Sequence, residues 1–201
     1  MRSTAAYSLI AVAALTLALS SGCGQNTIEG HTRPTLLSIN AGQPLHADVF
    51  VSDTTLVGMG YIPEETVEVV FSNPPSQAFL DMTPDDPYGN FVFTAATIRY
   101  EVLQLLEGGG SFSTPNLPTV SIPMHLTIPV GTEMTTSLVL APASIKLEAP
   151  IVDIMPGGTA PNGEAVVRAE IIFTGHEQGS DRDQIIEAST TILFADYADE
   201  N

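Results

Sequence analysis

The chain has 201 residues, of which 44% are hydrophobic and 14% charged, and its formal net charge is −17 at pH 7. This length fits one ordinary domain, and the hydrophobic content is too high for a disordered chain. Only 6 Lys and Arg residues stand against 23 Asp and Glu residues, which excludes the clustered positive charge that nucleic-acid binding requires. The single cysteine excludes a disulfide framework and a cysteine-rich zinc site.

The first 22 residues have the pattern of a secretory signal peptide. Arg2 precedes an apolar run from Leu9 to Leu19, and small residues follow. The apolar run is too short to cross a membrane as a helix of the mature protein. We therefore expect residues 1–22 to be removed, which takes Arg2 away and leaves 179 residues with a charge of −18.

The segment Leu19-Ser20-Ser21-Gly22-Cys23 resembles the lipobox of bacterial lipoproteins, which has an aliphatic residue, two small residues and an acceptor cysteine. Ser20 stands where the aliphatic residue is usual, and Leu19 lies one position earlier. The resemblance implies cleavage before Cys23 and a diacylglycerol thioether on its sulfur, and two acyl chains already suffice for firm anchoring. Gly24, in place of Asp, resembles lipoproteins that are sent to the outer membrane.

After the signal peptide the sequence divides into three parts. Residues 23–40 lack sustained periodicity and are predicted to be a lipidated tether, residues 41–197 a β-sandwich domain and residues 198–201 a tail. Within the domain, apolar residues alternate with a period of two, which is typical of strands. The alternation predicts strands at 46–51, 66–71, 91–102 (long or bent), 120–128, 135–140, 144–147, 165–173 and 185–194, with long loops at 81–90 and 104–117.

The predicted strands differ in how their two faces are occupied. Segment 120–128 alternates most regularly, and Pro123 within it cannot donate to a ladder, which predicts an edge strand. Segments 165–173 and 185–194 have apolar residues on both faces in places, which is typical of central strands. With no convincing amphipathic helix and 15 prolines, the sequence predicts an all-β, antiparallel two-sheet β-sandwich. Because Trp and a cysteine pair are absent, "immunoglobulin-like" describes its architecture only.

Three stretches of the domain are similar to a group of small bacterial lipoproteins with a β-sandwich body. They are HADVFVSDTTLV at 46–57, VEVVFSN at 67–73 and IIFTGHEQGSDRDQIIEASTTILFADYAD at 171–199. The group offers no established activity, so the resemblance implies a fold and an envelope location but no chemistry.

Motifs for nucleophilic or phosphate chemistry are absent from the sequence. It contains neither Gly-x-Ser-x-Gly nor Ser-x-x-Lys, and Gly108–Gly110 lacks the strand-to-helix setting of a nucleotide loop. His176-Glu177 lacks the second histidine of a metalloprotease motif, so a turn between strands is favoured. Two further histidines, His31 and His46, lie on other segments, and His125 is expected to face solvent on its strand.

Two acidic loops are the candidate metal sites, because carboxylate oxygens are the ligands that calcium prefers. One loop offers Asp81, Asp85 and Asp86, and the other offers Asp181 and Asp183. Neither has the spacing of a calcium-binding loop, and solvated acidic loops are the favoured interpretation.

These features predict a non-enzymatic, lipid-anchored protein of the bacterial cell envelope that displays its sandwich as a binding or structural module and needs no cofactor. The expected partners are the membrane, through Cys23, and an envelope protein, with no nucleic acid. Two alternatives stay open: a small-ligand or calcium-binding envelope lipoprotein, and a hydrolase, which needs two carboxylates on facing elements.

Overall fold

The computed structural model describes residues 30–52, 60–106, 117–161, 163–180 and 182–197. The predicted signal peptide, Cys23, Asp181 and the tail lie outside the described residues. The described strands are β1 (Thr35–Ile39), β2 (Leu45–Asp48), β3 (Val51–Ser52), β4 (Gly60–Tyr61), β5 (Glu65–Ser72), β6 (Phe91–Leu106), β7 (Val120–Ile128), β8 (Glu133–Ala141), β9 (Glu164–Glu177) and β10 (Asp183–Ala195). The short helical turns are η1 (Asn40–Gly42), η2 (Gln77–Phe79), η3 (Pro87–Gly89), α2 (Ala143–Lys146) and η4 (Ile151–Ile154).

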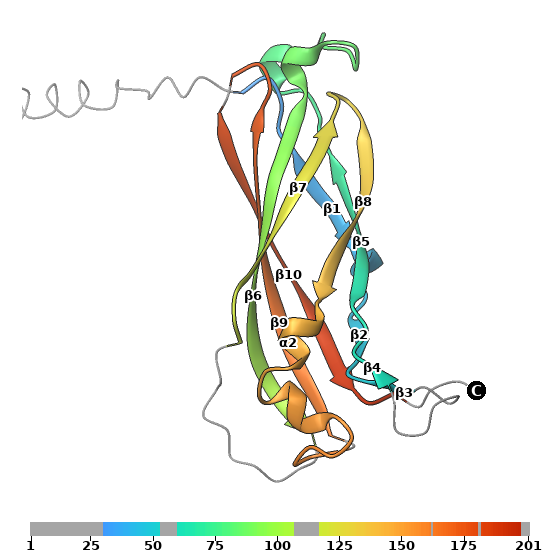
Figure 1. Ribbon diagram of the computed structural model, residues 1–201. Coiled ribbons are helices and arrows are strands. Elements are labelled where there is room, and N and C mark those ends of the chain that lie inside the picture. Colours follow the sequence, from blue (N-terminus) through green and yellow to red (C-terminus); the bar gives the residue numbers. More distant parts are fainter. Residues whose placement is uncertain (1–29, 53–59, 107–116, 162, 181, 198–201) are drawn as a thin grey trace, which may run out of the picture.

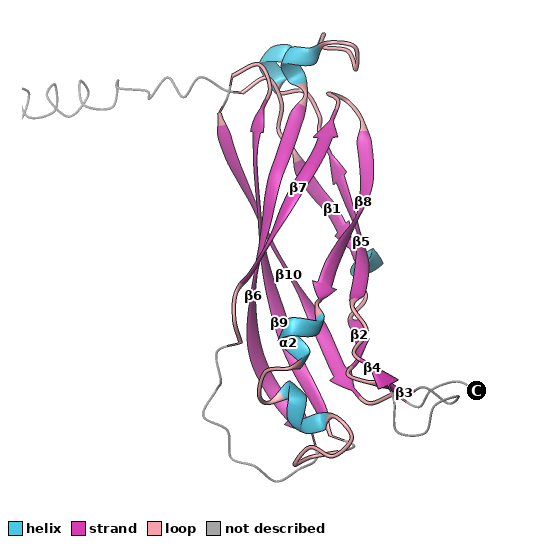
Figure 2. Ribbon diagram, in the orientation of Figure 1, coloured by secondary structure: helices cyan, strands magenta, loops and turns pink. Residues whose placement is uncertain are grey.

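The strands build two packed sheets. One sheet has the order β1-β5-β8 and the other the order β2-β10-β9-β6-β7, with the short pair β3-β4 beside them. Every pairing between these strands is antiparallel except that of β2 with β10. Figure 1 shows the two sheets lying against each other along the length of the molecule, and Figure 2 shows how little of it is helical. The predicted all-β, two-sheet sandwich is confirmed.

Aromatic side chains from both sheets meet in the core. Phe71 of β5 lies with its ring centroid 4.3 Å from that of Phe93 on β6 and 5.0 Å from that of Phe173 on β9. All three are fully buried, and such ring pairs add about 0.5–1.5 kcal/mol to the stabilisation that burial gives. A polar contact also joins the sheets, because the Tyr100 hydroxyl donates to the Leu140 carbonyl oxygen at 3.0 Å.

The chain passes from one sheet to the other between β1 and β2. At this corner Asn40, Ala41 and Gly42 have φ values of 48°, 51° and 77°, the left-handed region that reverses an extended chain over a few residues. The Asn40 amide donates to the carbonyl oxygens of Gln43 and Pro44, both at 3.0 Å, and so holds the corner. The tether predicted to extend to residue 40 is therefore wrong at its C-terminal part, because β1 lies within it and pairs with β5.

Most of the strand predictions are confirmed, and three details are wrong. β7 covers the predicted residues 120–128 and lies at a sheet edge, and β6 is long and irregular as expected. The predicted strand 46–51 is divided between β2 and β3, and residues 104–106 of a predicted loop belong to β6. Segment 144–147 is helical in α2, where one turn after Pro142 buries Ile145 and Lys146 together.

The sandwich has two ends. The upper end, at the top of Figure 1, carries residues 30–33, the connection 73–90 with η2 and η3, and the turn between β9 and β10. The lower end carries β3, β4, α2 and η4. The 14 residues of β9 run between them, which corresponds to about 45 Å at about 3.3 Å per residue.

Candidate functional site

A buried carboxylate holds the first described residues of the chain at the upper end. Glu177, the last residue of β9, is fully buried because it continues the inward-facing alternation of that strand. Its Oε1 accepts the backbone N–H of Thr32 at 2.9 Å, and its Oε2 accepts the Ser180 hydroxyl at 2.6 Å. His31 Nδ1 lies 3.1 Å from the same Oε2. We call Glu177, His31, Thr32 and Ser180 the Glu177 clamp.

The opposite side of residues 31–33 is held by the connection that follows β5. The Arg33 N–H donates to the Pro74 carbonyl at 3.0 Å, and the Ser76 N–H donates to the His31 carbonyl at 2.8 Å. The His31 ring also packs on Phe79, with 4.5 Å between ring centroids. The N-terminal segment is thus fixed between the end of β9 and this connection.

The connection 73–90 is itself braced by contacts within it and with the five-stranded sheet. The fully buried Asn73 amide donates to the carbonyl oxygens of Gly89 and Ile128, both at 2.9 Å. The Asp86 carboxylate accepts the Tyr88 N–H at 3.0 Å and so caps η3. Gly179 lies so close that a Cβ on it would stand 2.6 Å from the Tyr88 carbonyl oxygen, which only glycine allows. The loop is therefore a fixed part of the upper end.

The structure brings the two candidate acidic loops to the same end without forming a metal site in the described ranges. Asp81 and Asp85 are exposed, Asp86 serves as the cap of η3, and Asp183 is the exposed first residue of β10. Asp181 lies outside the described residues. Across the described part of the chain, no group of three or more His, Cys, Asp or Glu side chains is placed to hold a metal ion.

A second buried ionic group lies at the lower end. Lys146 is the only lysine of the sequence and its side chain is fully buried. Its ammonium donates to the carbonyl oxygens of Asp48 at 2.5 Å and Pro63 at 2.6 Å, and to the Glu65 carboxylate. Three donors therefore meet three acceptors. Burial lowers the pKa of Lys146 and raises the pKa of Glu65, while the charge of each partner opposes the shift of the other.

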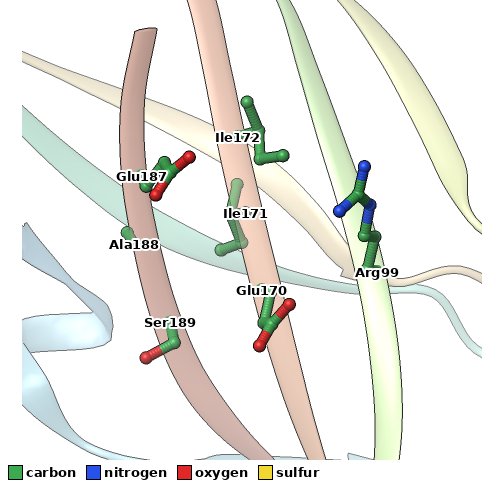
Figure 3. A pocket seen from close by; sticks show the side chains of 7 residues that line it. All are labelled: Arg99, Glu170, Ile171, Ile172, Glu187, Ala188 and Ser189. Carbon is green, nitrogen blue, oxygen red and sulfur yellow. The ribbon is translucent and has the colours of Figure 1, made fainter.

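The five-stranded sheet has an open hollow of about 460 Å³ on its outer face. Figure 3 shows the residues around it, with Arg99 on β6 and two carboxylates, Glu170 on β9 and Glu187 on β10. All three side chains are exposed on this face. Catalytic carboxylates work in sheltered pockets where burial separates their acid and base roles, so this surface gives the hydrolase alternative no support.

A second open hollow, of about 440 Å³, lies beside the Glu177 clamp. Arg33 from the N-terminal segment and Arg182, which directly precedes β10, line it, together with Gly30, Thr32, Asp183, Gln184 and Ile185. Both arginines have interaction partners within the protein. We assign this hollow to the junction between the N-terminal segment and the sandwich.

The four histidines lie in separate places. His125 is exposed on the outer face of β7, as expected, and exposed His46 lies 3.1 Å from the Tyr197 hydroxyl. His31 belongs to the Glu177 clamp. The prediction that His176-Glu177 forms a turn is wrong. Both residues lie in β9, and this end of the strand is still paired with β6 and β10.

Comparison of the chain with protein-family models and with curated proteins found no match. Within the described ranges, no helix has the length and apolar character that crossing a bilayer requires.

Proposed function

We propose that the protein is a lipoprotein of the bacterial cell envelope, held by acyl chains on Cys23, which displays a non-enzymatic β-sandwich as a binding or structural module. The observation that carries this proposal is the order of residues around Cys23. An apolar run from Leu9 to Leu19 leads through small residues to the only thiol of the chain. Gly24 after the cysteine favours the outer membrane as the destination.

The Glu177 clamp supports an anchored role. Only residues 24–29 separate the acceptor cysteine from Gly30, the first described residue. A pull on the anchor reaches Thr32 before it reaches β1, and Thr32 is fastened to Glu177 at the end of the central strand β9. Such a force is carried by the large sheet and does not peel β1 from its edge.

The use of the buried ionisable groups supports a non-enzymatic module. Glu177 is engaged by Thr32 and Ser180, and Lys146 by Glu65 and two carbonyl oxygens. A catalytic acid or base must reach a substrate in a pocket, whereas these groups hold segments of their own chain together. The polar atoms of Glu177 and Lys146 are already engaged in contacts within the protein.

The strand order supports the finer proposal of an immunoglobulin-like architecture. The first strand segment pairs antiparallel in one sheet as β1, and its continuation β2 pairs parallel with the last strand β10 in the other. The remaining order, β10-β9-β6-β7 facing β5-β8, is compatible with a two-sheet arrangement of the immunoglobulin type and so supports this proposal.

Replacing the acceptor cysteine tests the proposal. In Cys23→Ser we expect no incorporation of labelled fatty acid, and the protein leaves the membrane fraction or stays as uncleaved precursor. Ser20→Ala is the matched control, because it keeps a small residue and the acceptor, and it should label like the wild type. Equal labelling of Cys23→Ser and wild type would overturn the proposal.

A further inference from the structure

Two large apolar side chains stand exposed at the upper end of the sandwich. Leu80 has 61% and Tyr88 64% of its surface accessible, and both lie on the connection 73–90 between β5 and β6. Figures 1 and 2 show this connection at the same end of the molecule as the first described residues, 30–33. Tyr61 and Leu147 are similarly exposed at the lower end, so what distinguishes this tip is its position beside residues 30–33, where the described chain begins.

The connection presents these side chains on a firm support. Residues on either side of them are fixed, since Phe79 packs on His31 and Asp86 caps the turn that contains Tyr88. Gly89 is buried, and the Asn73 amide holds its carbonyl oxygen. Leu80 and Tyr88 are therefore exposed by the fold itself.

The number of residues between Cys23 and Gly30 limits how far this tip can be from the anchor. The seven residues 23–29 span at most about 25 Å when fully extended, at no more than about 3.6 Å per residue. The sandwich is about 45 Å long, because the 14 residues of β9 run from end to end at about 3.3 Å per residue. With Cys23 at the lipid surface, the upper end lies next to the membrane in any upright orientation.

Charge favours the upright orientation over one in which the sandwich lies flat. The mature chain carries −18, and on the broad outer face of the five-stranded sheet the exposed Glu101, Glu170 and Glu187 outnumber the exposed Arg99 and Arg168 only slightly. A negatively charged lipid surface repels the chain as a whole, so a contact limited to one end costs less than one along the length of the sandwich. The tip offers the membrane a small apolar contact, although Asp81 and Asp85 accompany it.

We propose that Leu80 and Tyr88 insert into the interfacial layer of the same bilayer that holds the acyl chains on Cys23. The sandwich then stands on the membrane through two contacts, with its lower end directed away from the lipid. Tyrosine suits this layer because its ring is apolar and its hydroxyl stays hydrated. This inference rests on the proposed function.

The test uses the full, lipid-modified protein reconstituted into phosphatidylcholine vesicles. Leu80→Cys and Tyr88→Cys each introduce one thiol, and the acylated sulfur of Cys23 does not react with thiol labels. The matched controls are Tyr61→Cys and Leu147→Cys at the lower end, whose native side chains are 61% and 56% exposed. Each thiol carries a polarity-sensitive fluorophore, and the vesicles contain a lipid with a quencher in its headgroup region.

The expected result is a blue-shifted, lipid-quenched emission at positions 80 and 88 and an unshifted, unquenched emission at positions 61 and 147. Aqueous emission at 80 and 88 on protein that stays bound to the vesicles would overturn this inference and leave the anchor in place. A blue shift without lipid quenching would assign the tip to a second copy of the chain and also overturn it. Protein that carries no acyl chain on Cys23 and does not bind to the vesicles would overturn the proposed function itself.

Discussion

The Lys146 ammonium contacts the Glu65 carboxylate at the lower end and also donates to the carbonyl oxygen of Asp48. Glu65 begins β5 in the three-stranded sheet, while Asp48 ends β2 in the five-stranded sheet. One buried side chain therefore links α2 to both sheets. Because Lys146 has no contact with water, its charge depends on these acceptors.

Removing the ammonium should strongly destabilise the sandwich. In Lys146→Met, Glu65 and two carbonyl oxygens lose their donor, and we expect the free energy of unfolding in urea to fall by about 3–5 kcal/mol. The double variant with Glu65→Gln should lose less than the sum of the single changes, because it removes the unpaired carboxylate as well. Arg168→Met breaks the exposed ion pair with Glu101 and serves as control, with an expected loss of about 1 kcal/mol at most. Similar losses in Lys146→Met and the control would contradict the assigned role.

Tyr100 should make stability fall at alkaline pH. Burial raises the pKa of its hydroxyl above the ordinary 10.0, so the unfolded chain loses this proton at a lower pH than the folded one. The contribution of the Tyr100 hydroxyl to the free energy of unfolding is complete below pH 10 and declines as the pH rises above 10. Tyr100→Phe loses the hydrogen bond to Leu140, about 1 kcal/mol near pH 7, and we expect this difference from wild type to shrink by about pH 11.

Urea unfolding at both pH values measures the effect. Tyr88→Phe is the control, because its exposed side chain should leave stability nearly unchanged at either pH. A Tyr100→Phe deficit that stays constant between the two pH values would show that the hydroxyl does not titrate differently on folding.

The sheets were predictable because a strand with one buried face records that face in its alternation. In β9, Val167, Ile171 and Phe173 are buried while Arg168 and Glu170 are exposed, and the sequence alone separates these sets. β1 was missed because it is short and lies at an edge, where the exposed Leu37 weakens the pattern. The corner at Asn40 and the pairing of β2 with β10 depend on contacts far apart in sequence, which periodicity does not encode.

The sequence contains weak indications that Glu177 and Lys146 are buried. Glu177 occurs at the inward-facing position two residues after Gly175, so the alternation of β9 already pointed it into the protein. Lys146 is the only lysine and stands between Ile145 and Leu147, an unusual setting for a solvated cation. Their partners, Thr32 and Glu65, lie more than 80 residues away in sequence, and no local pattern could identify them.

The two faces of β7 should respond differently to a charge. Met124 is buried at 8% exposure, and Met124→Asp places a carboxylate with no built partner in the core, which costs several kcal/mol, about 3 or more. His125→Asp on the exposed face of the same strand should change stability by about 0.5 kcal/mol or less. Melting temperatures of the two variants measure the contrast, and equal losses would contradict the strand facing.

The Glu177 clamp should control how firmly the N-terminal segment is held. Glu177→Ala leaves the Thr32 N–H and the Ser180 hydroxyl without their acceptor, and we expect a loss of about 3 kcal/mol in unfolding free energy. Glu177→Gln keeps a side-chain carbonyl oxygen and should lose less. Glu187→Ala, an exposed glutamate on β10, is the control and should lie within about 0.5 kcal/mol of wild type.

Hydrogen exchange distinguishes a local clamp from a general weakening of the fold. If Glu177 fastens the segment, the Thr32 amide should exchange much faster in Glu177→Ala under conditions where the variant remains folded. The Phe173 amide, in the paired middle of β9, should keep its protection under the same conditions, because its partners in β6 and β10 are unchanged. Unchanged protection at Thr32 would show that the contacts of residues 31–33 with the connection 73–90 hold the segment without Glu177, and the force path proposed for the anchored protein would then run through that connection.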